Sequence, residues 1–170
     1  RVLGPLKNPV PLKGDGMKTI ETTLDVGGWN NIKMAFEIVS CLSLKYNRAM
    51  VIPKPEKWYL INDGDSHLFD FFDEASFKSI IPISTNPDKS SEVNFDDDKC
   101  IIETTYSMKN SHFKKFDMIS KYKNWYIDSR KCRHFTYYPR HFVGKKYNNL
   151  ICKAFRLNRK IIKASADLLK

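Results

Sequence analysis

The order of apolar and polar residues predicts a strand, a helix and a second strand in the first third of the chain. Residues 17–24 are rich in Thr and Ile, which is typical of a β-strand. Apolar side chains then recur at the spacing of a helix with one buried face, at Ile32, Ala35, Phe36, Val39, Leu42 and Tyr46. The polar pair Asn47-Arg48 ends this pattern, and residues 49–53 form a short apolar run that stops at a proline. This order predicts a βαβ unit and therefore a parallel sheet.

The remaining chain continues the α/β pattern with weaker signals. The pattern predicts a short helix before an apolar run at 80–83, an exposed loop at 85–99, a buried strand at 100–106, and a helix over 146–170 with apolar positions Leu150, Ala154, Leu157, Ile161 and Ala164. Residues 112–150 mix aromatic and basic side chains and show no clear period. Residues 1–16 contain many Pro and Gly, and we expect a lead-in segment there, followed by one domain over 17–170.

Charge is distributed unevenly along this globular composition. The chain has 170 residues and a net charge of +10, with 42% hydrophobic and 28% charged residues. Residues 1–108 hold 12 Lys/Arg and 16 Asp/Glu, a net of −4, whereas residues 109–170 hold 17 and 3, a net of +14. Such asymmetry favours an anionic partner for the second part, and nucleic acid, an anionic membrane face and a nucleotide diphosphate all qualify. A lysine-rich solvated surface explains the same numbers.

The cysteines and the hydropathy pattern exclude some classes of protein. The four cysteines lie far apart and form no C-x-x-C pair, so we expect buried thiols and no zinc site, while spacing leaves disulfides open. No apolar run approaches the roughly 18 to 20 residues that span a bilayer. Residues 1–16 do not have the charged-then-apolar order of a signal peptide, and no N-x-S/T sequon is present.

The junction between the first strand and the helix carries an unusual group of residues: Gly27, Gly28, Trp29, Asn30 and Asn31. A glycine turn lets a ligand approach the backbone, and the helix that follows offers free N–H groups and positive potential. The junction lacks both the G-x-G-x-x-G dinucleotide pattern and the GK[ST] of a P-loop. Two interpretations remain open from the residues alone, a tight turn with an asparagine cap and a ligand-binding loop.

The stretch from Gly27 to Pro53, GGWNNIKMAFEIVSCLSLKYNRAMVIP, resembles the first motif of the GDP-fucose protein O-fucosyltransferase family. That family typically carries Gly-Gly-Phe-Asn-Asn-Gln, an apolar helix, and then Asn-Arg-Thr-Leu-Val-Leu-Pro. The similarity continues in KPEKWYLI and more weakly in FFDEASFKSIIPIS, so that it covers residues 17–83. Here Trp29 replaces the common Phe and Ile32 replaces the common Gln.

The resemblance implies an α/β fold with a Rossmann-like parallel sheet flanked by helices, the N-terminal half of a GT-B fold. It implies transfer of fucose from GDP-fucose to a Ser or Thr hydroxyl of a protein acceptor, with inversion and without a metal or other cofactor. Asn31 matches an asparagine beside the reacting groups and is the expected catalytic residue. Gly27, Gly28, Trp29 and Asn30 are the expected donor-binding residues. Relatives work in the secretory pathway, and the resemblance implies the same compartment.

One departure from the family concerns the donor-binding half. The family carries His-x-Arg-Arg-Gly-Asp or a similar motif on a later strand, and this chain contains no such arginine motif. We therefore expect that the chain corresponds to the N-terminal half of such an enzyme and is inactive by itself. A non-catalytic domain that binds a glycan or a peptide is the first alternative.

Other candidate sites are weaker. Asp63-x-Asp65 has the form of a metal-binding pair, but two aspartates around a glycine also make an ordinary turn. The histidines, His67, His112, His134 and His141, show no H-E-x-x-H spacing, and packing or surface roles are expected for them. Residues 122–147 alternate rings with cations, which suits nucleic acid, but they match no known nucleic-acid-binding signature. A nucleic-acid-binding domain is the second alternative.

Overall fold

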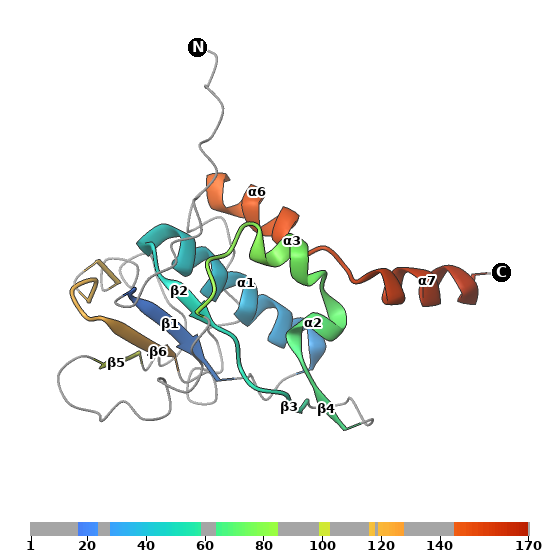
Figure 1. The fold of residues 1–170 in the computed structure, drawn as a ribbon, viewed down its shortest axis with the longest axis horizontal. Coiled ribbons are helices and arrows are strands. Elements are labelled where there is room, and N and C mark those ends of the chain that lie inside the picture. The colour runs from blue at the N-terminus through green and yellow to red at the C-terminus, as the bar shows by residue number, and fades with distance from the viewer. Residues whose placement is uncertain are drawn as a thin grey trace, which may run out of the picture.

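The protein has an α/β fold in which helices pack against a small parallel sheet (Figure 1). A computed structural model of the chain describes residues 17–23, 28–58, 64–84, 99–102, 116–117, 119–127 and 145–169. The predicted lead-in segment at 1–16 and most of the predicted loop at 85–99 lie outside these residues.

The main sheet has four strands in the order β2-β1-β6-β5, and every neighbouring pair is parallel. The strands are β1 (Thr19–Thr22), β2 (Ala49–Val51), β5 (Lys99–Ile102) and β6 (Asn124–Ile127). Ile20 of β1 lies opposite Met50 on one side and Trp125 on the other, and all three are buried. The prediction of an α/β domain with a parallel sheet is confirmed, and β1 is an inner strand of that sheet.

Helix α1 (Trp29–Tyr46) is the centre of the fold. It packs against β1 and β2, and it also contacts α6 (Lys145–Ala154). The predicted single buried face is therefore incomplete, since Glu37, Ser40 and Ser43 are buried as well. The helix ends at Asn47, whose φ of 50° is left-handed and whose N–H donates to the carbonyl of Ser43, as the polar break in the sequence predicts.

Between β2 and β5 in the sequence, the described residues form four short elements. They are the antiparallel pair β3 (Glu56–Lys57) and β4 (Asp65–Ser66), followed by α2 (Leu68–Phe71) and α3 (Glu74–Lys78). His67 caps α2 and Asp73 caps α3 through their side chains. The predicted short helix before the apolar run is α3, and α2 is an additional turn that the pattern did not predict. Ile83 then bridges to Met50, which places the predicted apolar run beside the sheet.

The predicted helix over 146–170 is wrong in its continuity, because two helices share this segment. Helix α6 ends at Ala154, and α7 (Arg159–Leu168) begins after the cap residue Asn158. The residues between them bind the α2–α3 segment: the N–H of Asp73 donates to the carbonyl of Arg156 (2.8 Å), and the N–H of Asn158 donates to the carbonyl of Phe71 (2.8 Å). These bonds to another segment replace those that would have continued the helix.

Arg48 is the largest buried polar side chain of the described core, and it joins the amino ends of the strands. Its guanidinium donates hydrogen bonds to four backbone carbonyls, those of Thr19 (3.2 Å), Ser120 (3.2 Å), Tyr122 (2.8 Å) and Lys123 (2.9 Å). The same group stacks on the ring of Trp125, 3.6 Å from its centroid. One side chain therefore ties β1 to the turn that precedes β6.

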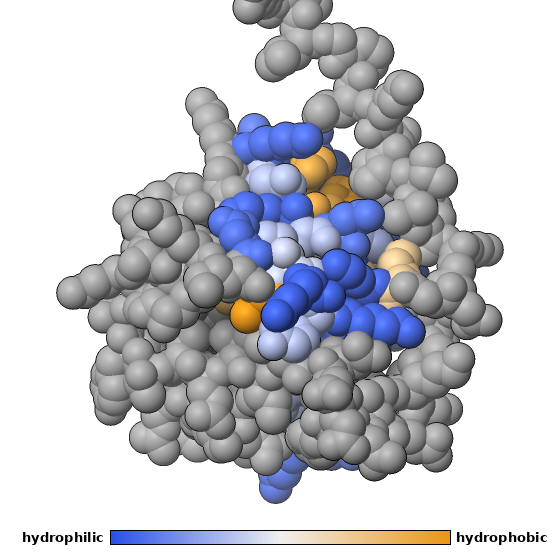
Figure 2. All heavy atoms as spheres, turned by 90° about the vertical axis from the view of Figure 1, so that its left-hand side faces the viewer, coloured by the Kyte–Doolittle hydropathy of each residue, from blue (hydrophilic) through white to orange (hydrophobic). Residues whose placement is uncertain are grey.

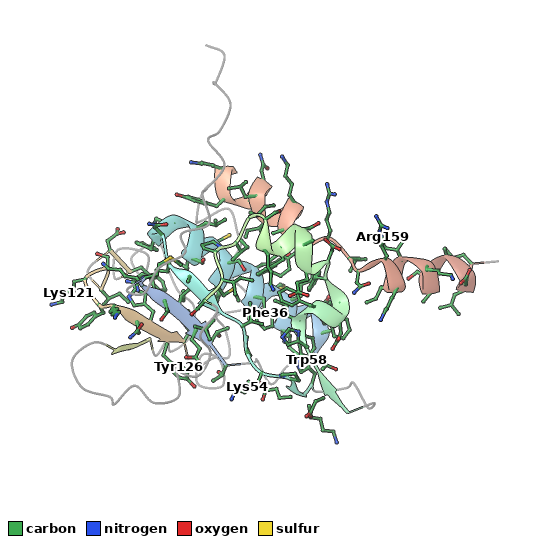
Figure 3. All side chains as sticks on the ribbon, viewed as in Figure 1. Phe36, Lys54, Trp58, Lys121, Tyr126 and Arg159 are labelled. Atoms are coloured by element: carbon green, nitrogen blue, oxygen red, sulfur yellow. The ribbon has the colours of Figure 1, made fainter. Side chains whose placement is uncertain are left out.

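The surface around this end of the sheet is polar. Figure 2 views the molecule from this side, and its described surface is mostly hydrophilic. Lys18, Lys121 and Lys123 are exposed, and Figure 3 shows Lys121 at the edge of the molecule. At this end of the sheet, Tyr46 of α1 contacts the segment that precedes β6: its hydroxyl donates a hydrogen bond to Asp117 Oδ1 (2.8 Å).

Tyr46 is expected to make stability fall at alkaline pH. Burial, and then its bond to the Asp117 carboxylate, raise the pKa of Tyr46 well above the usual value of about 10. Above pH ~10 the unfolded chain therefore loses this proton while the folded protein keeps it, so the stabilisation present at lower pH decreases as pH rises. Between pH 8 and 12, the free energy of unfolding measured with urea should decrease less for Tyr46→Phe than for the unmodified protein. Equal decreases would contradict this role of Tyr46.

Candidate functional site

The candidate site lies where the inner strand β1 leads into α1. Gly28 is the N-cap residue of α1, and Trp29, Asn30 and Asn31 form its first turn. Gly28 has φ −68° and ψ 174°, an extended conformation that any residue adopts, so the dihedral angles do not require a glycine here. Gly27 lies outside the described residues.

The two asparagines belong to the helix and do not cap it. The N–H groups of Asn31 (2.9 Å) and Ile32 (3.3 Å) both donate to the carbonyl of Gly28, and α1 has no side-chain cap. The interpretation of this junction as a turn with an asparagine cap is therefore wrong. The Asn30 side chain is exposed and that of Asn31 is half-buried. Neither amide makes a side-chain hydrogen bond within the described residues, so both are available to a ligand.

The start of α1 is electrostatically suited to an anion. Its first turn contains no acidic residue, and its first N–H groups have no acceptor within the helix. A helix of 18 residues carries roughly half a positive charge at such an end. The one cation of the second turn, Lys33, forms an ion pair with the buried Glu37 (2.6 Å) and does not need another anion. The positive potential here comes mainly from the backbone.

The position of this helix start in the sheet also favours a ligand. β1 pairs with β2 on one side and with β6 on the other, and all three run in the same direction. Ligands of open parallel sheets bind outside the carboxyl ends of the strands, where the chain order changes direction. The chain moves from β1 outward to β2, and it returns from the opposite edge through β5 to β6. The junction after β1 thus lies at the carboxyl end of an inner strand, the end of a parallel sheet at which such sites form.

Trp29 has a structural role that the sequence pattern did not reveal. It belongs to an aromatic cluster that we define as Trp29, Phe36, Trp58, Phe71 and Phe72. Trp29 lies 4.2 Å from Phe71, 5.5 Å from Phe72 and 5.6 Å from Trp58, between ring centroids. Figure 3 labels Phe36, a residue of α1, and Trp58, which follows β3, and their rings are 6.5 Å apart. The cluster anchors the first turn of α1 to the segment around α2.

The structure brings together four of the five predicted site residues, because they are consecutive in sequence. It also adds Phe71 and Phe72 as supports of the site. Both belong to the FFDE stretch, and no pattern in the sequence predicts their contact with Trp29.

The other candidate residues give no second site within the described residues. No group of three His, Cys, Asp or Glu side chains that would hold a metal occurs in that part of the chain. Asp65 is exposed in β4, and Asp63, His112, His134 and His141 lie outside the described residues. His67 acts as a helix cap, in line with the structural role expected for it. Cys41 is buried as predicted, but Cys152 is exposed, because it lies on the outer face of α6.

The helix lengths and the comparisons with known proteins also bear on function. No helix among the described residues is long and apolar enough to cross a membrane. Asn31, Asn30, Trp29 and Gly28 together form an uncapped helix start supported by an aromatic cluster, at the carboxyl end of an inner parallel strand. Comparison of the chain with protein-family models, curated proteins and solved structures finds no match.

Proposed function

We propose that the chain is the N-terminal half of an inverting GT-B glycosyltransferase that transfers fucose from GDP-fucose to a Ser or Thr hydroxyl. The observation that carries this proposal is the uncapped start of α1, with Asn31 in its first turn, at the carboxyl end of β1. The sequence resemblance over residues 17–83 supplies the donor and the reaction. The βαβ unit formed by β1, α1 and β2 agrees with that resemblance in order and in strand direction.

The residues of the site have distinct roles in this proposal. The acceptor oxygen attacks the anomeric carbon of fucose, the bond from that carbon to the phosphate oxygen breaks, GDP leaves with the bonding electrons, and the hydroxyl proton passes to a phosphate oxygen of the departing GDP. Negative charge then grows on the diphosphate, and the N–H groups of Trp29 and Asn30 at the start of α1, which have no acceptor within the described residues, stabilise it. The Asn31 amide orients the hydroxyl or shares in this stabilisation, since an amide is too weak a base to take the proton.

The supporting residues keep this arrangement fixed. Trp29 positions the first turn through its contacts with Phe71 and Phe72, while its backbone N–H remains available. The proposed reaction uses no metal. A second domain that supplies the arginine motif of the donor half completes the proposed enzyme, and the chain alone is expected to have no turnover.

Asn31→Ala is the direct test of the proposed site. In the full-length enzyme we expect kcat for fucose transfer to fall about 100-fold, the usual cost of removing one group that stabilises developing charge. The thermal unfolding midpoint should stay within about 2 °C, since the Asn31 side chain makes no hydrogen bond to the described residues. Asn148→Ala in α6 is the matched control, because Asn148 is also half-buried in a helix but belongs to a different element.

Two results would separate the site from the function. Unchanged turnover in Asn31→Ala would remove Asn31 from the catalytic site while leaving the transferase proposal intact. A full-length protein that neither binds nor hydrolyses GDP-fucose, measured by calorimetry and by release of GDP, would end the transferase proposal itself.

A further inference from the structure

Helix α7 begins at a firmly held point. The Asn158 side chain accepts a hydrogen bond from the N–H of Lys160 (2.9 Å), and its amide nitrogen donates to the carbonyl of Phe69 (3.2 Å). Its backbone N–H donates to the carbonyl of Phe71 (2.8 Å), and Leu157 forms a β-bridge with Phe72. The direction in which α7 leaves the domain is therefore set by the α2 segment.

Beyond Asn158, helix α7 (Arg159–Leu168) is exposed to solvent. None of its ten residues is buried, and Figure 1 shows it projecting away from the other elements. Its apolar side chains share one face, at the spacing of an amphipathic helix: Ile161, Ile162, Leu168 and, directly after the helix, Leu169. Ile162 is 54% exposed, Leu168 is 87% exposed and Leu169 is 89% exposed. An isolated helix of this length is marginal in water, so a surface that covers this face would stabilise it.

The opposite face of α7 and the residues just before the helix are basic. The exposed cations of this region are Lys153, Arg156, Arg159, Lys160 and Lys163. Asp167 is the one acidic residue of α7. Hydrogen bonds with Ser76, and to a smaller extent the charges of Arg159 and Arg156, lower the pKa of the nearby Asp73. Figure 3 shows Arg159 at the start of the helix, on the projecting part of the molecule. Positive charge therefore exceeds negative charge around the apolar face.

We propose that α7 is an interfacial helix that docks the protein on an anionic lipid surface. A short helix with an apolar face, a basic polar face and low overall hydrophobicity lies in the plane of a membrane interface. Ten residues extend about 15 Å, half of the hydrocarbon thickness, so α7 does not span the bilayer. Two paired copies of so short a helix offer too little surface for a stable dimer, which needs about 1,200 Å² or more. A nucleic acid would use the cations but leave the apolar face uncovered.

Vesicle co-sedimentation with the chain tests this proposal. The probes are vesicles of phosphatidylcholine alone and vesicles with about 30% phosphatidylserine, where each cation near the surface contributes roughly fivefold in affinity. We expect at least about tenfold stronger binding to the anionic vesicles, and weaker binding in 0.5 M salt than in 0.1 M salt. Ile162→Ser/Leu168→Ser should reduce binding about tenfold by removing apolar contact. Lys160→Glu/Lys163→Glu should remove the preference for anionic lipid.

Lys163→Arg is the matched control, because it keeps the charge on the polar face and leaves the apolar side chains of the same helix in place, and it should bind like the unmodified chain. All variants should keep the circular dichroism of the folded domain, since α7 contributes no buried side chain. Absence of binding to anionic vesicles overturns the proposal. So does equal binding by the Ile162→Ser/Leu168→Ser variant, or binding to an oligonucleotide or to a second copy that depends on α7 when vesicle binding is absent. The assay contains no nucleotide sugar, so its result is independent of the transferase proposal.

Discussion

Replacing Arg48 with methionine is expected to lower the free energy of unfolding by about 3–5 kcal/mol. Methionine has a similar length, so the loss comes from polar interactions more than from a cavity. Four backbone carbonyls lose their donor in a buried region, and the Trp125 ring loses the guanidinium stacked at 3.6 Å. Urea unfolding followed by circular dichroism measures the loss directly.

Two control variants identify the cause. Arg48→Lys keeps the charge but has a single nitrogen in place of the planar fork, and we expect it to recover less than half of the loss. Lys45→Met removes a cation from the last turn of α1, three residues before Arg48 and nearer the surface, and should cost under about 1 kcal/mol. If Arg48→Met were as stable as Lys45→Met, Arg48 would not hold β1 and the turn before β6 together.

Phe72→Ala is expected to cost a similar amount, about 3–5 kcal/mol. Phe72 is fully buried between two elements that are distant in sequence, with its ring 5.5 Å from Trp29 of α1 and 4.9 Å from Phe155 next to α6. Removing the ring leaves a cavity between them, and the thermal unfolding midpoint should fall by roughly 10 °C or more. The same change should loosen the first turn of α1, which Trp29 anchors.

Phe72→Leu is the control for Phe72→Ala, because it removes much less side-chain volume. Leucine fills most of the space, and we expect it to cost under about 1.5 kcal/mol. Hydrogen exchange at the start of α1 should rise more in Phe72→Ala than in Phe72→Leu, relative to exchange in β1. A small loss for Phe72→Ala, equal to that for Phe72→Leu, would show that the aromatic cluster does not connect the two elements.

The elements predicted correctly are those in which one residue pattern extends over many positions. The helix over 29–46 and its flanking strands follow from the apolar spacing and from the polar break at Asn47. β6 is as short as β1 but was missed, because its residues, Asn124 to Ile127, lie within a segment of uniform aromatic and basic composition. Nothing in that composition marks where the strand begins or ends.

The errors at the site and at the C-terminal helices have a common physical origin. Arg48 belongs to the predicted polar break but is buried, because its acceptors are carbonyls that only the folded sheet brings together. The break at Asn158 depends on carbonyls of the α2 segment. Asn30 and Asn31 favour a cap by residue type, yet the helix begins earlier, with Gly28 at the N-cap position and no side-chain cap. In each case, partners distant in sequence or the exact start of a helix decided the outcome.

The central position of α1 has a consequence for biosynthesis. One side of this apolar helix is covered by the sheet, whose inner pair joins Thr19 to Asn124, and another by α6. The strands that α1 contacts, β1 and β2, adjoin it in sequence, but α6 is made long after the helix, since Lys145 follows Tyr46 by about 100 positions. At a ribosomal rate of about 5–20 residues per second, the side of α1 that packs on α6 stays uncovered for on the order of 5–20 s. A nascent chain paused in this interval is therefore a natural client for a chaperone.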